Sequence, residues 1–403
     1  MNPSSPAGAG PVLLAFSGGL DTSFCVAWLK ETLGRPIITV TVDTGGGVDT
    51  VALEARALAL GAERHLTVDA RREFFDSVLK YLVFGNVRRG QLYPLCVGAE
   101  RGLQAKLVAT QAAGLGSDTV AHGSTAAGND QVRFEVAIRT LVPGLEVLAP
   151  VRDHGFKREA QVAWLQERGL PVPAGGGAYS INRGLWGTTI GGKETLDSRE
   201  SIPESAWVVT AGAFEAPREP ARHRLGFERG VPVSLDGEPL DPVALIERLE
   251  TLAGAFGIGR GIHLGETILG TKGRVAFEAP AAETLLCAHR ELEKLTLTGT
   301  QLKIKEPLAL LYGDLVHEGQ QLEPAARDIE ALLTSSQARV TGQVQLLFRP
   351  GVLFVEGVTS PHSLLAASRG SYGESAGEWS AADALGLSRM KALAGMLHTR
   401  AGS

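Results

Sequence analysis

The chain has 403 residues, of which 44% are hydrophobic and 21% charged, so it has ample apolar material for a folded core, with two domains as the first expectation. A formal net charge of −5 lacks the excess of Lys and Arg that sequence-independent nucleic-acid binding needs, and no apolar run reaches the roughly 18 residues of a membrane helix. The three cysteines (Cys25, Cys96 and Cys287) are too widely spaced to imply disulfides or a zinc site, and the start of the chain lacks the basic residues of a signal peptide, so we expect a cytoplasmic protein.

Short apolar runs alternate with helical patterns through the first part of the chain. The runs at residues 12–16 and 37–42 are apolar on both faces, which is typical of central strands in a parallel sheet. Helical spacing follows each of them, at residues 22–33 and 51–60. Further short strands are expected at residues 65–68, 119–121 and 145–149. This alternation predicts an open α/β sheet.

A Pro- and Gly-rich stretch at residues 171–177 ends this alternation and predicts a domain boundary. The second part reads as α+β. Strands are expected at residues 206–210, 222–227, 231–235 and 267–276, helices at 242–255 and 281–294, and a hairpin at 340–348 and 352–357. A modest amphipathic helix is expected at residues 381–397. The predicted division is a flexible tail (1–10), a first domain (11–172), a second domain (173–380) and a C-terminal helix and tail (381–403).

The most informative stretch is residues 17–23, Ser-Gly-Gly-Leu-Asp-Thr-Ser, which joins the first strand to the first helix. Two glycines let the backbone approach an anion closely, and the N-terminus of a helix favours negative charge. An acid beside a phosphate cradle makes chemical sense if Asp21 binds Mg²⁺ that bridges phosphate oxygens. The alternative is a glycine turn with Thr22 or Asp21 as a helix cap. The stretch is not a Walker A loop, because no Gly-Lys-Ser/Thr follows it.

Residues 17–23 resemble the pyrophosphate-binding loop of the N-type ATP pyrophosphatases, and two further segments narrow the resemblance to the argininosuccinate synthase family. These segments are residues 122–125 (His-Gly-Ser-Thr) and 128–135 (Gly-Asn-Asp-Gln-Val-Arg-Phe-Glu). Supporting matches occur at residues 149–153, 179–180, 185–187, 227–232, 257–260 and 340–342. The resemblance covers roughly residues 12–365.

The resemblance implies an adenine-nucleotide α-hydrolase-like domain, a synthetase and multimerisation domain, and a C-terminal helix that helps to form a homotetramer. It implies a ligase that uses ATP and Mg²⁺ to adenylate citrulline, releases pyrophosphate and condenses the product with aspartate. No nucleic acid or membrane partner is expected. In the implied chemistry Asp21, Ser17 and Asp130 are catalytic, and Asp21 is the metal ligand.

The resemblance also assigns binding residues. The nucleotide would be bound by Ala15, Phe16, Ser17, Gly18, Gly19, Leu20, Asp21, Thr22, Ser23, Val42 and Gly123. Thr125, Asn129 and Asp130 match aspartate positions, where Asp130 can pair with an ammonium group. Citrulline positions match Tyr93, Arg133, Ser180 and Thr189. Tyr93 could instead be a core residue, Ser180 a turn residue, and Arg133 a structural ion pair with Glu135.

The chain departs from the family pattern mostly around the acceptor. Gly98 stands where the family has Ser, Gly265 where it has Glu, and Phe277 where it has Tyr; Glu266 could replace that Glu if the loop shifts by one residue. Ala127 stands where the family has a lysine beside ATP. Three hypotheses therefore stay open: a working synthase with a divergent pocket, a paralogous ligase with another acceptor, and a non-catalytic nucleotide-binding protein.

Overall fold

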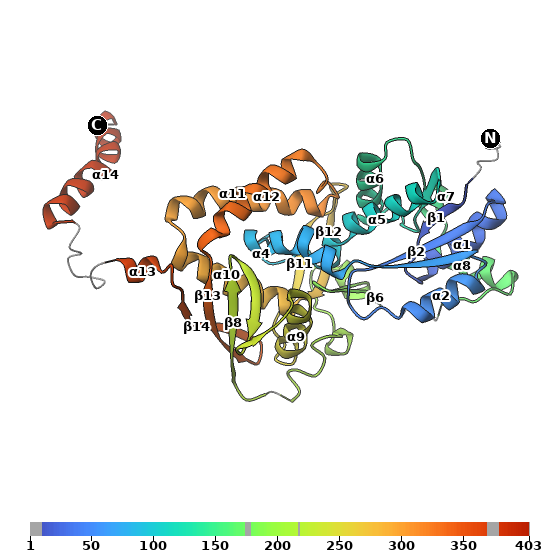
Figure 1. The fold of residues 1–403 in the computed structure, drawn as a ribbon, viewed down its shortest axis with the longest axis horizontal. Coiled ribbons are helices and arrows are strands. Elements are labelled where there is room, and N and C mark those ends of the chain that lie inside the picture. The colour runs from blue at the N-terminus through green and yellow to red at the C-terminus, as the bar shows by residue number, and fades with distance from the viewer. Residues whose placement is uncertain (1–9, 174–178, 217, 369–378, 403) are drawn as a thin grey trace.

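The computed structural model describes residues 10–173, 179–216, 218–368 and 379–402. It is elongated, with a parallel sheet at one end and the C-terminal helix standing away from the body at the other (Figure 1). The expected tail lies almost wholly outside the described residues, as does part of the expected boundary at 171–177. Among the described residues, no helix is both long and apolar enough to cross a membrane.

The first part folds around a five-stranded parallel sheet, as the alternating pattern predicts. Its strands are β1 (Val12–Ala15), β2 (Ile37–Asp43), β3 (Arg64–Asp69), β4 (Thr119–Ala121) and β5 (Glu146–Leu148), in the order β3-β2-β1-β4-β5. The first three residues of β1 are fully buried, which explains their unbroken apolar run. The strand order reverses between β1 and β4, and ligands of open α/β sheets bind where the order reverses, at the carboxyl ends of the strands.

Helices cover both faces of this sheet. They are α1 (Leu20–Leu33), α2 (Thr50–Ala59), α5 (Arg101–Gly114), α6 (Asp130–Leu141), α7 (Pro150–His154) and α8 (Arg158–Glu167). The sequence analysis placed the start of α1 at residue 22, two residues late, because it assigned residues 17–23 to a loop, although Leu20 lies four residues before Phe24 and is buried with it. Helix α1 packs on α8 through Phe24 and Trp164, whose rings lie 5.3 Å apart.

One segment of the first part crosses into the second. It comprises α3 (Arg71–Phe74), the π-helical turn η1 (Phe75–Leu79), α4 (Lys80–Gly85) and the 3₁₀ turn η2 (Cys96–Ala99). Helix α4 lies among the helices of the C-terminal part (Figure 1). Just after it, the amide of Asn86 donates to Glu293 over 2.7 Å. One continuous apolar core therefore joins the two parts.

The C-terminal part holds two antiparallel sheets and four longer helices. One sheet has the order β11-β12-β7-β6 and consists of β6 (Ser180–Gly184), β7 (Gly187–Gly191), β11 (Arg260–Glu266) and β12 (Lys272–Glu278). The other has the order β10-β9-β8-β13-β14 and consists of β8 (Ala221–Glu228), β9 (Val231–Leu235), β10 (Glu238–Pro239), β13 (Gly342–Arg349) and β14 (Val352–Thr359). The longer helices are α9 (Pro242–Gly254), α10 (Pro280–Thr296), α11 (Gly299–His317) and α12 (Pro324–Ser336).

One predicted strand of this part is wrong, and another begins later than predicted. Residues 206–210 form no strand, because the backbone N–H groups of Val208, Val209 and Thr210 donate to the fully buried Glu278 carboxylate instead of to a ladder. The expected strand at 267–276 begins only at Lys272, since Thr267 and Thr271 close a turn between β11 and β12. Strand β11, the β6–β7 hairpin, α11 and α12 were not predicted.

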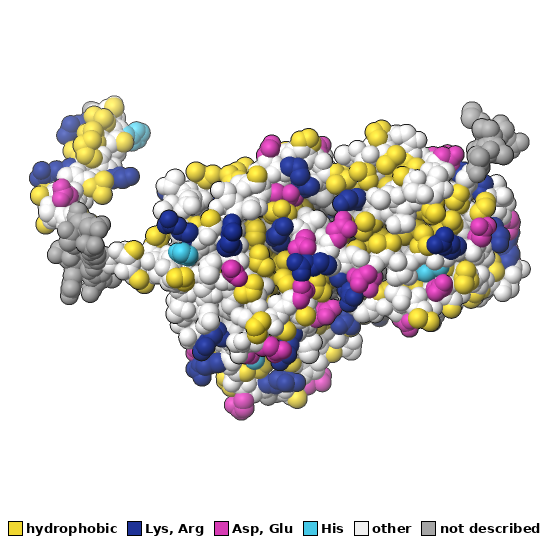
Figure 2. Space-filling view, viewed as in Figure 1, with side chains coloured by type: hydrophobic (Ala, Val, Ile, Leu, Met, Phe, Trp, Pro, Cys, Tyr) yellow, Lys and Arg dark blue, Asp and Glu magenta, His cyan; other side chains and the backbone are white. Residues whose placement is uncertain are grey.

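The C-terminal helix α14 (Ala381–Ala401) forms as expected, but it buries none of its residues. Figure 2 shows its apolar side chains in the open. The exposed ones are Leu385, Leu387, Met390, Leu393, Met396 and Leu397. A free helix with this much exposed apolar surface is typical of an element that packs against another chain.

Candidate active site

Residues 17–23, which we call the phosphate loop, follow β1 directly. They lie where the strand order reverses, at the carboxyl ends of β1 and β4. Gly18 has a φ of 73°, a conformation that glycine adopts without strain. Gly19 caps α1 and offers no side chain, so the first N–H groups of the helix have no side-chain cap. A Cβ atom added at Gly123, which follows β4, would lie 3.0 Å from the backbone N of Thr22. Gly123 thus packs directly against the first turn of α1, and residues 17–19 with the uncapped N–H groups of α1 form a backbone cradle of the kind that binds an anion.

The polar side chains of the loop differ in exposure and in their hydrogen-bond partners. Ser17 is exposed, and its hydroxyl lies 3.3 Å from that of Thr22. Asp21 accepts a hydrogen bond at Oδ1 from Gln161 over 2.9 Å, which fixes the carboxyl group and leaves Oδ2 for another partner. Ser23, expected to bind the nucleotide, is fully buried, and its hydroxyl has no hydrogen-bond partner among the described residues.

Two residues beside the loop escaped the sequence analysis. Arg56 of α2 donates to the carbonyl of Gly18 over 2.6 Å, and so brings a positive charge next to the loop. Gln161 of α8 orients Asp21. Both come from helices far along the chain, and no local motif marks them.

The residues expected near the adenine of ATP lie at the ends of β1 and β2, in largely buried backbone. The N–H of Phe16 donates to Val40, and its carbonyl accepts from the Thr41 hydroxyl over 2.7 Å. Ala15 ends β1, and Val42 is buried near the end of β2. Beyond β2, a Cβ atom on Gly46 would lie 2.8 Å from the carbonyl of Arg183 in β6, so the β6–β7 hairpin borders this side.

The residues expected to bind aspartate surround the start of α6. Thr125 is exposed, and Asn129 accepts at Oδ1 from the backbone N–H of Ile268 over 2.9 Å. Asp130 forms ion pairs with Arg101 over 3.1 Å and with Arg133 over 2.7 Å. Burial would raise the pKa of Asp130, but the two guanidinium groups lower it to about 2. The carboxylate is therefore ionised at any working pH.

The same ion pairs connect the aspartate residues to the acceptor residues. Arg133 pairs with Asp130 and also donates from Nε to the carbonyl of His317 over 2.7 Å. It does not pair with Glu135, which instead pairs with Arg139 and Arg152. Arg133 therefore does form an ion pair, but its partner is Asp130, a residue of the candidate site, and not Glu135.

The residues expected to bind the acceptor come from separate parts of the chain. Tyr93 is buried, stacks on the His263 ring at 5.3 Å, and meets the Phe277 ring edge-on at 5.2 Å. Thr189 of β7 pairs with Phe277 of β12 in the sheet. Ser180 lies at the exposed start of β6, opposite Gly191. The structure therefore groups Tyr93 with Phe277 and Thr189, and among the described residues Ser180 forms no hydrogen bond to any of them.

Two of the family departures can be located near these residues. A Cβ atom on Gly98 would lie 3.2 Å from Nη2 of Arg133, so this glycine lies directly against the guanidinium group. Gly265 lies on β11, opposite Gly273, and neither residue carries a carboxylate. Glu266 pairs with Lys272 and is exposed, so it does not substitute for the missing acid within the described structure.

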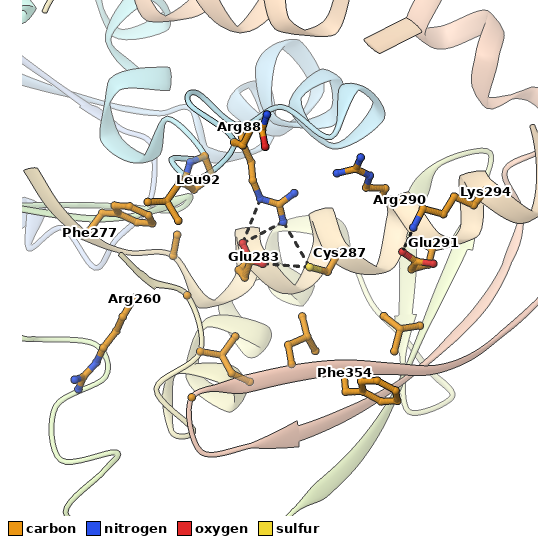
Figure 3. Close-up of a pocket in the computed structure, with 18 residues that line it drawn as sticks. Arg88, Leu92, Arg260, Phe277, Glu283, Cys287, Arg290, Glu291, Lys294 and Phe354 are labelled. Atoms are coloured by element: carbon orange, nitrogen blue, oxygen red, sulfur yellow. Dashed lines mark hydrogen bonds and ion pairs between the residues drawn. The ribbon is translucent and has the colours of Figure 1, made fainter. Parts of the chain in front are cut away.

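A separate cavity of about 660 Å³ lies on another side of Phe277 (Figure 3). Arg88 pairs with Glu283 across it, and the Cys287 thiol donates to Glu283 over 3.1 Å. Burial and the neighbouring carboxylate raise the pKa of Cys287 to about 12, so the thiol stays protonated and unreactive. None of the phosphate-loop residues line this cavity.

Metal ligands are not clustered in the part of the chain that the structure describes: it holds no group of three or more His, Cys, Asp or Glu residues suited to a metal ion. A magnesium ion that is held by one carboxylate and by substrate phosphates needs no such group. The Asp21 carboxylate, next to an uncapped helix N-terminus, fits that mode.

Comparison with known proteins gives a consistent result over both parts of the chain. Residues 11–171 match the family model described as Arginosuccinate synthase N-terminal HUP domain, and residues 179–398 match the Arginosuccinate synthase C-terminal domain. The chain is 41% identical to the argininosuccinate synthase of Symbiobacterium thermophilum, with 87% of this chain and 88% of that protein covered. It is 39% identical to that of Dehalococcoides mccartyi (88% and 87% covered) and 38% identical to that of Pyrobaculum aerophilum (88% and 90% covered).

Proposed function

This chain belongs to the argininosuccinate synthase family, and from that premise we propose that its site condenses citrulline with aspartate while ATP is converted to AMP and pyrophosphate. The carrying observation is the backbone cradle at residues 17–23, where the N–H groups at the start of α1 have no side-chain cap and suit the leaving pyrophosphate. The paralogous and non-catalytic alternatives are not favoured, since curated relatives of near-equal length are synthases.

In the first half-reaction the ureido oxygen of citrulline attacks the α-phosphorus of ATP, and the bond to the β-phosphate oxygen breaks. Charge develops on the departing pyrophosphate. The uncapped N–H groups at the start of α1, the hydroxyls of Ser17 and Thr22, and nearby Arg56 can stabilise that charge. Because these groups are fixed by the fold, they need little reorganisation during the reaction.

A magnesium ion bound by Asp21 and phosphate oxygens would neutralise part of the same charge. Gln161 supports this role, because its amide donor holds Asp21 in one orientation and leaves the second carboxylate oxygen for the metal.

In the second half-reaction the aspartate amine attacks the ureido carbon, and AMP leaves. Asn129 and Thr125, at the start of α6, can donate to the carboxylates of aspartate, and ionised Asp130 can accept from its ammonium group. Asp130 also pairs with Arg133, which is suited to the citrulline carboxylate. This shared ion pair supports the binding of the two amino acids next to each other.

We further propose that the chain forms a homotetramer and acts in the cytoplasm. The exposed apolar side chains on α14 support its packing on another subunit, as expected of a homotetramer, and a cytoplasmic location is consistent with the family's biosynthetic role. Sedimentation of the full chain beside a variant that lacks residues 379–403 tests the assembly.

The direct test of the reaction measures AMP and pyrophosphate formation with ATP, Mg²⁺, citrulline and aspartate, each omitted in turn. Formation of argininosuccinate that depends on all four supports the proposal. Tight ATP binding by folded protein without AMP formation would support the non-catalytic alternative instead. Turnover with another ureido compound but not with citrulline would support the paralogous ligase.

A further inference from the structure

His317, at the end of α11, presents a hydrogen-bond donor that nothing in the described structure accepts. Its Nδ1 lies 3.2 Å from Nη2 of Arg133, and a guanidinium group can only donate. Burial, together with the charges of Arg133 and Arg89, lowers the pKa of His317 to about 3, so the ring is neutral. Since Nδ1 accepts, the single ring proton must lie on Nε2. That N–H is buried in a residue only 6% exposed, and it has no acceptor.

The position of this histidine is fixed by close packing. The α11 helix ends at His317, and Gly319 follows with a φ of 78°. A Cβ atom on Gly319 would lie 2.7 Å from Cα of Arg133. The end of α11 is thus pressed against α6, which explains why the His317 carbonyl and ring both contact the Arg133 side chain.

Arg89 supplies a second donor of the same kind. Its Nη2 donates to the carbonyl of Glu266 over 3.2 Å, but Nη1 is buried without a partner. The Arg89 backbone N–H donates to the carbonyl of Tyr93 over 2.7 Å, which places Arg89 beside the acceptor residues. The next residue, Gly90, approaches the His263 ring, since a Cβ atom there would lie 3.2 Å from Cε1 of His263, and the charge of Arg89 lowers the pKa of both His263 and His317.

The charges around these donors favour an anion. The groups whose charges act on His317 are Arg133, Arg89, His263 and Asp130. Asp130 is the one carboxylate among them, and Arg101 and Arg133 already pair with it. An unsatisfied buried N–H is uncommon in folded proteins and calls for an explanation, such as a bound ligand or water. Two such donors beside an excess of positive charge suit a carboxylate, which accepts from two donors at once.

We propose that His317 Nε2 and Arg89 Nη1 bind the carboxylate of citrulline, and that they replace contacts which Gly98 cannot make. This inference rests on the proposed function, because it names the ligand group that the same site recognises. It makes His317 and Arg89 determinants of acceptor specificity for a carboxylate-bearing ureido compound.

The test compares citrulline with citrullinamide, in which the carboxylate is a neutral amide. Michaelis constants are measured for both compounds with saturating ATP and aspartate, and their dissociation constants are measured by calorimetry without nucleotide. The variants are His317→Leu, which removes both ring nitrogens, and His317→Asn, which keeps a donor and an acceptor. Arg89→Gln is a second, independent variant. His223→Ala is the control, since His223 pairs with Asp236 in the other sheet, away from the site.

We expect the unmodified protein to bind citrulline ~10-fold or more tightly than citrullinamide. A hydrogen bond to a charged group contributes enough free energy for a difference of this size. His317→Leu and Arg89→Gln should each remove most of that preference by raising the Michaelis constant for citrulline, with kcat changed by only about threefold. His317→Asn should restore part of the preference, and His223→Ala should leave it unchanged.

The inference is overturned if citrulline and citrullinamide bind equally to the unmodified protein. It is also overturned if folded His317→Leu or folded Arg89→Gln keeps the full preference for citrulline over citrullinamide. In that case the partner of His317 Nε2 and Arg89 Nη1 would be a buried water and not the carboxylate. If His317→Leu does not fold, Arg89→Gln decides. A lack of turnover with citrulline would refute the proposed function, while the calorimetric preference would still decide the carboxylate contact.

Discussion

Gly123 provides the sharpest test of the phosphate cradle, because the structure leaves no room for a side chain there. A Cβ atom at this position would lie 2.9 Å from Cγ2 of Thr22, 3.0 Å from its backbone N and 3.1 Å from the carbonyl carbon of Asp21. Two of these three neighbours are backbone atoms and cannot rotate away. Gly123→Ala should therefore push the start of α1 and the end of β4 apart by roughly half an ångström.

The expected effect is on nucleotide handling more than on folding. Overpacking of this kind costs about 1–3 kcal/mol of unfolding free energy, which a domain of this size can tolerate. A displacement of up to ~1 Å in a positioning group can lower the rate by ~10²-fold, so we expect kcat/KM for ATP to fall by ~10- to 100-fold. The Michaelis constant for aspartate should change less.

Gly128→Ala is the matched control, five residues further along the same glycine-containing segment. The nearest neighbour of a Cβ atom there is the Thr125 hydroxyl at 3.4 Å, an ordinary contact. Activity is measured as pyrophosphate release, and folding by circular dichroism and melting temperature. Folded Gly123→Ala protein with kcat/KM for ATP within twofold of the unmodified value would refute the cradle, as would an equal loss in both variants.

Asp21→Asn should leave the melting temperature nearly unchanged but lower Mg²⁺-dependent pyrophosphate release by ~10²-fold, because one charged contact to the developing charge is lost; full turnover in the folded variant would contradict this role. Asp130→Ala should raise the Michaelis constants for both aspartate and citrulline and leave that for ATP nearly unchanged, because Asp130 also orients Arg133; an equal rise for ATP would show that the segment contacts the nucleotide. Burial raises the pKa of Glu100 from 4.5 to about 7, so the folded state loses stability as pH rises from about 4.5 through 7. At pH 8, Glu100→Gln should therefore be more stable than the unmodified protein, by up to ~3 kcal/mol, and the gain should vanish near pH 4; a pH-independent difference in chemical denaturation would show that Glu100 is not buried in this way.

The sequence alone determined much of the first part of the fold and the nature of its loop. The strands at residues 12–15 and 37–43 are apolar on both faces, so their burial in a parallel sheet can be read locally. The loop at residues 17–23 lies between such a strand and a helix. Its two glycines and its acid stand within seven residues, so an anion-binding loop can be predicted from this short stretch alone. Family membership could likewise be inferred from short contiguous segments, and the comparisons confirm it.

The second part was harder to predict for a physical reason. Strand β12 and the turn near Thr210 depend on Glu278. Its buried carboxylate accepts hydrogen bonds from backbone N–H groups of residues about 70 positions away. Helix α11 has apolar residues on several faces and a proline at position 307, so its helical periodicity is weak. In such cases tertiary contacts override the local pattern.

The composition of the acceptor pocket was decided by the tertiary structure. Arg89, His263 and His317 come from three separate elements, and nothing in their local sequence marks them as neighbours. The fold brings them to Tyr93 and Arg133 through the crossing segment after α4, strand β11 and the end of α11. A sequence reveals a site formed by one loop, because spacing along the chain fixes its geometry. A pocket assembled from distant segments depends on packing, and its charges and unsatisfied donors become visible only in the folded structure.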